Sequence, residues 1–312
     1  MSKTRLLVAL STFTLVNIVW AVSSTGTAHR RVSGSGVDSQ LGRAVGIAPI
    51  KLREDSRGLI VDAWINNSGP FTVALDTGAG TSIITNSLVQ RAGLQLQRSK
   101  VPLRGGLSST PIQSNQETSF SELSIGFPSN RLPATVTAAV VQTLPGSIDG
   151  VLDPTQVFGS LSYSVDFQKR ELLVLESKYL SNSKTLNGEG TVVRWISENG
   201  GHRPFVRLAD GRLALIDTGS SFGLAFSDRR AVNGQNPKAV RDLGGGAIQV
   251  REVAAQTVAI GSLVLRNIPT ELLINSAPGT PVILGRRALN PFRVTFDRAS
   301  NLIAIEATPD TN

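Results

Sequence analysis

The sequence predicts a mostly β protein built from two related lobes, and three observations lead to this fold class. Short apolar runs rich in Val, Ile, Leu and Thr are separated by 30 glycines and 15 prolines, as is typical of strands that end in turns. Signals for helices are few; the clearest covers residues 87–92, before Gly93, and a matching segment covers residues 227–232. Finally, the second half of the chain repeats the order of motifs found in the first half.

The repeat centres on an Asp-Thr-Gly triplet that occurs twice. The two triplets are Asp76-Thr77-Gly78 and Asp217-Thr218-Gly219. Each follows an apolar, strand-like run, at residues 71–75 in the first half and 213–216 in the second. With ordinary residue frequencies, a single triplet of this kind is expected by chance in about one chain of fifteen of this length. Two copies in corresponding places therefore indicate one shared site.

Three further pairs of segments follow in the same order in both halves. The paired glycine segments are Gly105-Gly106 and Gly244-Gly245-Gly246. Apolar segments then occupy residues 150–153 and 282–285. Both halves close on alternating apolar residues around a polar turn, at residues 165–176 and 294–306, which predicts a terminal hairpin in each half.

Two carboxylates on matching turns suit general acid–base chemistry. Carboxyl groups held about 3 Å apart cannot both ionise, so they share a proton and titrate as a coupled pair. The ionised carboxyl can take a proton from water while the protonated one donates to a scissile carbonyl. Asp76 and Asp217 are therefore suited to hydrolysing an amide without a metal ion, a thiol or a covalent intermediate.

On these motifs the chain resembles the aspartic protease superfamily, with the two-lobe arrangement of pepsin-like enzymes made from retropepsin-like units of bacterial type. The resemblance covers residues 46–308. It implies a bilobal fold of two related β-barrel-like lobes with the active site between them, and a catalytic pair formed by Asp76 and Asp217. It also implies supporting residues in the triplets and flap candidates in the glycine segments. The supporting residues are Thr77, Gly78, Thr218 and Gly219, and the flap candidates are Gly105, Gly106, Gly244 and Gly245.

Arg286 follows the apolar segment of the second half, as in retropepsins, but the first half departs from the family pattern. Asp153 replaces the supporting glycine that the family has after its apolar segment. We interpret Asp153 as a solvated residue at a turn before Pro154; the alternative is a third acid near the site. The flap tyrosine of pepsin-like enzymes also has no counterpart, because Tyr163 and Tyr179 lie far beyond the flap region.

The flap is therefore expected to be a glycine loop of the retropepsin type at residues 103–108, with a twin at residues 243–247. Glycine permits the tight backbone conformations that such a loop needs. An ordinary hairpin turn is the alternative interpretation.

The composition excludes several other kinds of catalysis. Without cysteine the chain has no thiol nucleophile, no disulfide and no Cys-ligated zinc site. His29 lies before the lobes and His202 is expected to be a solvated loop residue, so neither a metal nor a cofactor is expected. Like-charge blocks long enough to bind nucleic acid are also missing, although the formal net charge is +8.

The N-terminal region predicts export. Lys3 and Arg5 precede an apolar stretch at residues 6–22, and residues 19–21 fit a small-residue cleavage site. We interpret residues 1–21 as a secretory signal peptide; an uncleaved membrane anchor is the alternative. The protein is accordingly expected to be periplasmic or secreted, with membrane contact only if this segment is uncleaved.

The remaining chain is expected to divide into four parts. These are a flexible tail at residues 22–45, an N-terminal lobe at 46–176, a linker at 177–190 and a C-terminal lobe at 191–308. Since both triplets lie in one chain, a monomer is expected to supply the whole site. The predicted function is an aspartic endopeptidase that acts on polypeptide substrates. The alternatives are a non-catalytic peptide-binding module with the same fold and, with less support, a glycosidase that uses two acids.

Overall fold

The computed structural model describes residues 46–99, 102–182, 189–198, 200–227, 237–243 and 245–308. Of these described residues, 51% lie in strands and 9% in helices, which confirms the mostly β fold class. They belong to one compact unit, and no helix among them combines the length and apolar character needed to cross a membrane. The predicted signal peptide and tail lie outside the described residues. The predicted boundaries of the lobes and the linker remain predictions.

In the described part of the first half, ten strands form one sheet, which we call the first-half sheet. They are β2 (Arg53–Asp55), β3 (Gly58–Ile65), β4 (Ser68–Leu75), β5 (Ser82–Thr85), β6 (Gln97–Arg98), β9 (Gln116–Phe120), β10 (Leu123–Ile125), β11 (Arg131–Leu132), β12 (Val136–Val141) and β13 (Gly150–Leu152). Asn66 and Asn67 join β3 to β4 with positive φ angles of 50° and 60°, as a type I′ hairpin turn requires. β13 inserts between β4 and β5 and runs parallel to β4, so Leu152 stands beside Leu75.

Seven described strands of the second half form the second-half sheet, in the order β17-β18-β23-β19-β22-β21-β20. They are β17 (Phe205–Arg207), β18 (Leu213–Asp217), β19 (Leu224–Ser227), β20 (Lys238–Arg241), β21 (Ala247–Ile260), β22 (Leu263–Ile274) and β23 (Val282–Gly285). β23 inserts between β18 and β19 and runs parallel to β18. Because β13 lies in the same way between β4 and β5, the sequence repeat is also a structural repeat.

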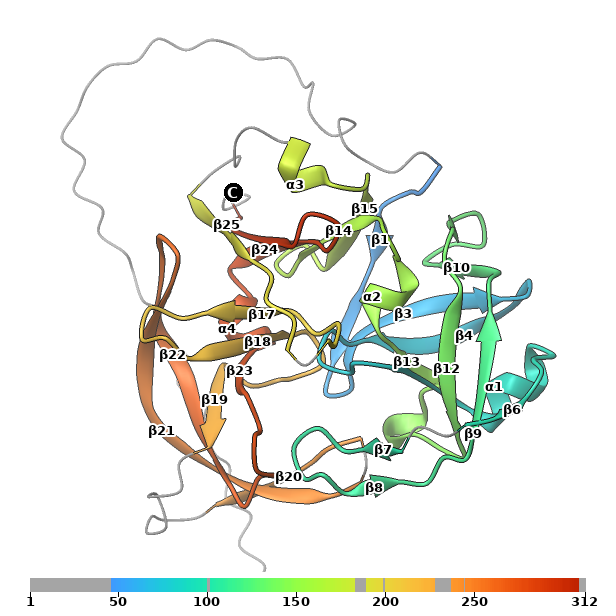
Figure 1. Cartoon of the computed structure of the whole chain (residues 1–312), viewed down its shortest axis with the longest axis horizontal. Helices are drawn as coiled ribbons and strands as arrows, with labels where there is room; N and C mark the ends of the chain where they lie inside the picture. The colour runs from blue at the N-terminus through green and yellow to red at the C-terminus, as the bar shows by residue number, and fades with distance from the viewer. Residues whose placement is uncertain are drawn as a thin grey trace, which may run out of the picture. The chain divides into compact units, whose positions relative to one another are not determined.

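A third sheet, the shared sheet, takes strands from both halves in the order β1-β15-β14-β24-β25-β16 (Figure 1). They are β1 (Ile50–Lys51), β14 (Ser162–Asp166), β15 (Glu171–Leu175), β16 (Gly190–Arg194), β24 (Phe292–Asp297) and β25 (Leu302–Ala307). The pairs β14–β15 and β24–β25 are the two predicted terminal hairpins, which are confirmed. β14 pairs with β24, where Ser164 lies opposite Thr295, and this pairing joins the two halves.

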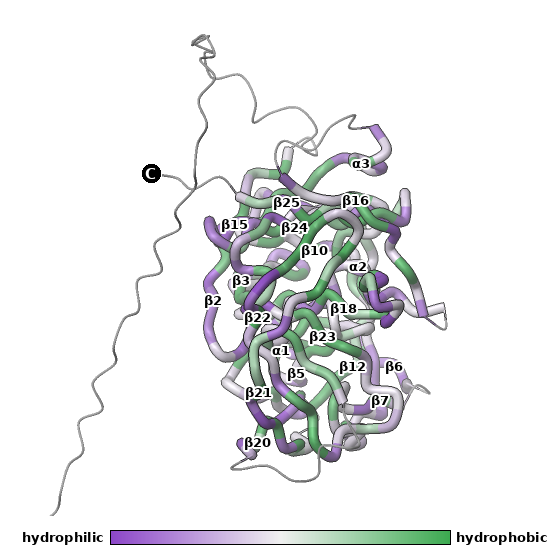
Figure 2. Tube along the Cα trace, turned by 90° about the vertical axis from the view of Figure 1, so that its left-hand side faces the viewer, coloured by the Kyte–Doolittle hydropathy of each residue, from purple (hydrophilic) through white to green (hydrophobic). Residues whose placement is uncertain are grey.

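An aromatic cluster packs around the junction of β14 and β24. Tyr163 of β14 stacks on Phe296 of β24 with ring centroids 4.8 Å apart. Phe158 lies 4.7 Å from Tyr163, and Trp195 lies 6.0 Å from Phe296, edge to face. All four rings are buried, and Figure 2 shows further hydrophobic stretches along inner strands such as β12 and β23. Burial of this apolar surface is the main driving force for the fold.

α1 (Asn86–Arg91) forms where residues 87–92 predict a helix, which confirms this prediction. Thr85 caps it by accepting a hydrogen bond from the N–H of Leu88 at 3.2 Å. The matching prediction at residues 227–232 falls almost entirely outside the described residues, and Ser227 ends β19. The other helices of the described chain are short: α2 (Pro154–Val157), α3 (Tyr179–Asn182), α4 (Arg286–Leu289) and a 3-10 turn (Pro145–Ser147).

Candidate active site

The two predicted catalytic residues lie at the same point of the structural repeat. Asp76 directly follows β4, and its N–H donates a 3.0 Å hydrogen bond to the carbonyl of Leu152 in β13. Asp217 ends β18 and stands opposite Gly285 of β23. Each acid is therefore fixed by a pair of parallel strands, which positions a side chain more firmly than a loop does.

The triplet glycines allow the two acids to approach each other. A Cβ atom on Gly78 would lie 2.7 Å from the carboxyl carbon of Asp217, and one on Gly219 would overlap the carboxyl of Asp76. Any side chain at either glycine would displace the facing acid. The structure therefore brings Asp76 and Asp217 together, while their catalytic role remains a prediction.

The two threonines tie the triplets together through reciprocal hydrogen bonds. The Oγ1 of Thr77 donates to the carbonyl of Ile216 at 2.6 Å and accepts from the N–H of Thr218 at 3.0 Å. In return, the Oγ1 of Thr218 donates to the carbonyl of Leu75 at 3.0 Å and accepts from the N–H of Thr77 at 3.0 Å. Both threonines are 1% exposed, so water does not compete for these bonds.

Thr77→Val is expected to lower the free energy of unfolding by about 1–3 kcal/mol. Valine keeps the shape of the side chain but leaves the buried carbonyl of Ile216 and the N–H of Thr218 without their partner. The control is Thr137→Val on β12, whose hydroxyl bonds to the hydroxyl of Ser119 at an exposed site and which should change stability by less than about 0.5 kcal/mol. Urea unfolding measures both, and equal losses would contradict a special role for Thr77.

The two acids differ in the hydrogen bonds that they accept from described residues. The Oδ1 of Asp76 accepts from the N–H of Gly78 at 2.7 Å. The Oδ1 of Asp217 accepts from two N–H groups, those of Gly219 at 2.9 Å and Ser220 at 3.0 Å. Because N–H donors stabilise a carboxylate, the ionised form is more stable at Asp217 than at Asp76.

Loss of hydration raises the pKa of both acids, although each residue keeps a partly exposed edge. The pKa of Asp76 is raised to about 8, first by loss of hydration and then by the charge of Asp217. The pKa of Asp217 is also raised by loss of hydration, but the N–H groups of Ser220 and Gly219 oppose the rise. The two carboxyls therefore influence each other's titration, and Asp76 holds the proton more readily.

Arg286, the first residue of α4, fastens the second triplet to the first half of the chain. Its side chain is only 4% exposed. Nη1 donates to the carbonyls of Thr218 and Gly219 at 3.1 and 3.0 Å. Nε pairs with Glu54 at 3.0 Å, and Nη2 donates to the carbonyl of Asp55 at 3.0 Å. Since β2 carries both of these acidic residues, the turn of the second triplet is held against the first-half sheet.

Asp153 is buried, so the prediction of a solvated residue was wrong. It does begin the turn into α2, where its Oδ1 accepts from the N–H and the hydroxyl of Thr155 at 2.9 and 2.8 Å. The residue is only 1% exposed, however, because α2 packs against the first-half sheet. Burial and then the charge of Asp76 raise its pKa, against the hydrogen bonds from Thr155. The structure thus favours the alternative, a third acid near the two triplets.

His202 also differs from the expectation of a solvated loop residue. It is half-buried, and its Nδ1 lies 2.7 Å from Nη2 of Arg298. In the part of the chain that the structure describes, no group of three or more His, Cys, Asp or Glu residues is arranged to hold a metal ion.

The first flap candidate lies in the loop between two short paired strands, and its flap role remains a prediction. β7 (Leu103–Arg104) pairs with β8 (Pro111–Ile112), and the pair Gly105-Gly106 opens the turn between them. In the second half, Gly245 lies in the turn between β20 and β21, whereas Gly244 lies outside the described residues. Figure 1 shows β7 and β8 close to β20, and hydrogen bonds confirm that the two turns are in contact.

Asp242 joins the two turns. Its Oδ2 accepts from the N–H of Ser108 at 2.9 Å, from the hydroxyl of Ser108 at 2.7 Å and from the N–H of Leu107 at 3.2 Å. A Cβ atom on Gly105 would overlap the carboxyl of Asp242, and one on Gly246 would overlap the hydroxyl of Ser108. Glycine is therefore needed where the two turns meet.

Each of the two turns also places a leucine side chain against the other half of the chain. Leu107 of the first turn packs against a cluster of the second half that includes Phe222. Leu243 of the second turn packs against a cluster of the first half that includes Ile83. Ala79 packs against the same cluster. Since Phe222 and Ala79 follow the triplets closely in sequence, the clusters that receive these leucines border both triplet turns.

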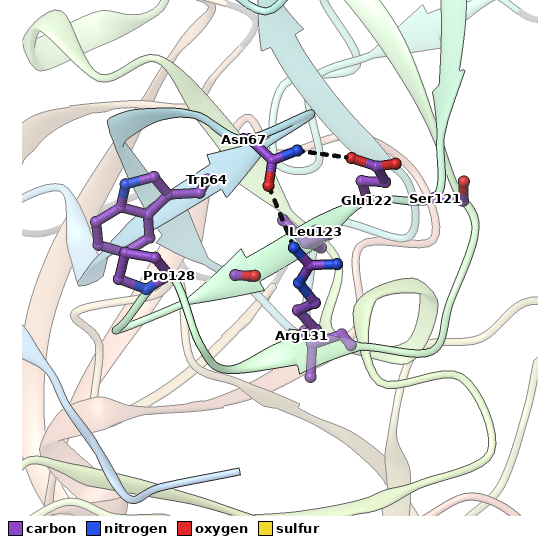
Figure 3. A pocket seen from close by; sticks show the side chains of 9 residues that line it. Trp64, Asn67, Ser121, Glu122, Leu123, Pro128 and Arg131 are labelled. Carbon is purple, nitrogen blue, oxygen red and sulfur yellow. Dashed lines mark hydrogen bonds between the residues drawn. The ribbon is translucent and has the colours of Figure 1, made fainter. Parts of the chain in front are cut away.

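A pocket of about 400 Å³ lies in the first half, and Figure 3 shows its lining. It is lined by Trp64, Asn67, Ser121, Glu122, Leu123, Ser124, Pro128, Arg131 and Leu132. None of the predicted site residues is among them. Its polar side chains bond to one another, from Arg131 to Asn67 at 3.4 Å and from Asn67 to Glu122 at 3.2 Å. The pocket therefore gives no argument for a particular ligand.

Comparison with protein families matches residues 61–153 to the aspartyl protease family. The matched segment contains the first triplet, the first glycine turn and Asp153. The match confirms the predicted relationship to the aspartic protease superfamily and supports a function of the aspartic protease type. Comparison with curated proteins found no match.

Proposed function

We propose that the chain is an aspartic endopeptidase in which Asp76 and Asp217 share one proton and activate a water molecule against a peptide carbonyl. The observation that carries the proposal is the close approach of the two acids. The side chain of each acid lies next to the glycine of the other triplet. The reciprocal threonine bonds hold this approach. The raised pKa of Asp76, about 8, keeps a proton on the pair at neutral pH.

In the proposed mechanism Asp217 begins ionised and Asp76 begins protonated. The Asp217 carboxylate takes a proton from water as the water oxygen attacks the peptide carbon, and Asp76 gives its proton to the carbonyl oxygen. The tetrahedral diol then collapses. Asp217 gives its new proton to the amide nitrogen, Asp76 takes a proton from one hydroxyl, and the C–N bond breaks. The products are a carboxylic acid and an amine, and the pair returns to its starting protonation without a cofactor.

The proposed substrate is an extended polypeptide bound between the triplets and the two glycine turns, which we propose as flaps. Its backbone can pair with strand edges as an added strand. The clusters that hold Leu107 and Leu243 favour apolar side chains of the substrate, because apolar side chains already pack there. The turns joined by Asp242 must separate before such a peptide can bind.

Ser108→Cys combined with Asp242→Cys is expected to make peptide cleavage depend on redox state. The chain has no cysteine, so these would be its two thiols, at side chains that are in contact in the structure. Oxidation should join the turns and abolish cleavage, and a reductant should restore it. Ser108→Cys alone is the control and should not respond to either treatment. A disulfide that forms and leaves cleavage unchanged would contradict the proposed flap role.

The proposed function is tested by incubating a library of unstructured peptides with the chain that lacks residues 1–21. Mass spectrometry of the products should show internal cleavage, with apolar residues on both sides of the cut. Peptides that bind and stay intact at every pH would contradict the proposal and would support a non-catalytic peptide-binding module.

We also propose that the protein acts as a monomer after export. Both triplets come from one chain, so one chain can supply the whole site. Cleavage activity that elutes only with a dimer on size exclusion would contradict the monomer. A mature protein found only in the cytoplasm would contradict export.

A further inference from the structure

Asp153 directly follows β13, just as Asp76 directly follows the neighbouring strand β4. Leu152 is the last residue of β13 that pairs in parallel with β4, and the next residues along the two strands are Asp153 and Asp76. Paired strands lie about 5 Å apart. In the second half, the position beside Asp217 is occupied by Gly285. The two halves therefore share a topology here and differ by one carboxyl group.

The second half has no room for a side chain at this position. A Cβ atom on Gly285 would lie 2.5 Å from the carbonyl oxygen of Phe222 and 2.9 Å from that of Ser220. The backbone bonding of the first half is different, since the N–H of Asp153 donates to the hydroxyl of Ser82 at 3.1 Å. The N–H of Gly285 donates instead to a backbone carbonyl. The first half thus accommodates the additional carboxyl.

The carboxyl of Asp153 is buried with one oxygen unpaired. Its Oδ1 accepts from Thr155, but its Oδ2 has no hydrogen-bond partner among the described residues. Ionising a carboxyl with an unpaired, buried oxygen is costly, so Asp153 keeps its proton to a higher pH than an exposed aspartate does. Burial raises the pKa of Asp153, and the charge of Asp76 adds to the rise, whereas the bonds from Thr155 and the nearby His202 lower it.

Other titratable groups interact electrostatically with Asp153 or with its neighbours. The hydroxyl of Tyr163 in β14 is also buried without a partner among the described residues. Burial and then the charge of Asp153 raise the pKa of Tyr163, and Arg298 opposes the rise. Arg298 in turn bonds to His202. Asp153 therefore interacts with Asp76 and with a set of buried or half-buried polar side chains that the proposed mechanism does not use.

We infer that Asp153 is a positioning residue for the proposed catalytic pair, a third carboxyl that ionises before Asp76 and whose negative charge then extends the pH range in which the pair holds its shared proton. The inference rests on the proposed function. A third acid that titrates with the pair makes the loss of the next proton more difficult, because like charges would then lie side by side. Without this acid, Asp76 loses its proton at lower pH, and cleavage stops earlier as the pH rises.

Asp153→Asn tests this inference, because it keeps the shape of the side chain and removes its titration. The upper limb of the pH–rate profile should move to lower pH by about one unit. Asp153→Gly, which introduces the residue that the second half uses, should move it in the same direction. The control Asp62→Asn removes a partly exposed acid of β3, paired with Arg53, and should leave the profile in place. An upper limb that does not move in Asp153→Asn would overturn the inference.

A second measurement does not depend on cleavage. An acid whose folded pKa is raised stabilises the fold below its unfolded pKa, and this stability is lost as the pH rises through the folded pKa. The melting temperature should therefore fall between about pH 4 and about pH 8, and it should fall less in Asp153→Asn than in the wild type. An equal fall of the melting temperature in Asp153→Asn and in the wild type would overturn the inference. If the melting temperature falls less in Asp153→Asn than in the wild type but no form of the protein cleaves peptides, the raised pKa of Asp153 is supported and the proposed function is overturned.

Discussion

Asp76→Asn and Asp217→Asn are each expected to reduce kcat for peptide cleavage by about 10³-fold or more. An amide side chain neither ionises nor gives up a proton near neutral pH, so each variant lacks one of the two proton transfers. The losses should not add in the double variant, because the two acids act as one unit. Initial rates of peptide cleavage at the optimal pH measure these effects.

Both Asn variants should still fold. Asn can accept the same backbone bonds, from Gly78 at position 76 and from Gly219 at position 217. A single cooperative thermal transition checks this point. Asp210→Asn removes an exposed acid paired with Arg212 and should cleave at the wild-type rate. Cleavage within about tenfold of the wild type in either triplet variant would contradict the shared-acid mechanism.

Arg286→Met is expected to lower the free energy of unfolding by about 3 kcal/mol. This value is the lower end of the range for breaking a buried ion pair, and we choose it because the side chain of Glu54 is 26% exposed. Methionine fills part of the volume, but the carbonyls of Thr218 and Gly219 lose their donor. The second triplet turn should then loosen, so cleavage should fall as well. Urea unfolding measures the loss of stability.

Arg170→Met is the matched control, because Arg170 approaches the same Glu54 at 3.9 Å from the surface, where it is 62% exposed. Exposed ion pairs contribute little, so this change should lower the free energy of unfolding by less than about 1 kcal/mol. Similar losses in the two variants would mean that Arg286 acts only as a charge near Glu54 and does not fasten the triplet turn.

Much of the fold could be predicted because its signals are local. Alternating apolar residues around a polar turn predicted the hairpins β14–β15 and β24–β25. A short run that ends before Gly93 predicted α1. The repeated motifs predicted two related halves, and β13 and β23 lie in equivalent places beside the two triplets.

The contacts that the sequence did not reveal join residues far apart in the chain. Asp153 precedes Pro154, a combination typical of exposed turns, and only the packing of α2 shows that it is buried. Asp242 accepts a hydrogen bond from Ser108, 134 residues away, and no local pattern marks such a contact. The position of Arg286 after an apolar segment was a signal, but its bonds to β2 could not be read from it.

The most direct test of the central claim is the pH–rate profile of peptide cleavage for the wild type beside Asp76→Asn. A shared proton predicts a bell-shaped profile for the wild type, with an upper limb near the pKa of Asp76, about 8, and cleavage by Asp76→Asn that is slower by about 10³-fold or more at every pH. Cleavage by Asp76→Asn with an unchanged profile would contradict the claim that the two triplet acids share one proton.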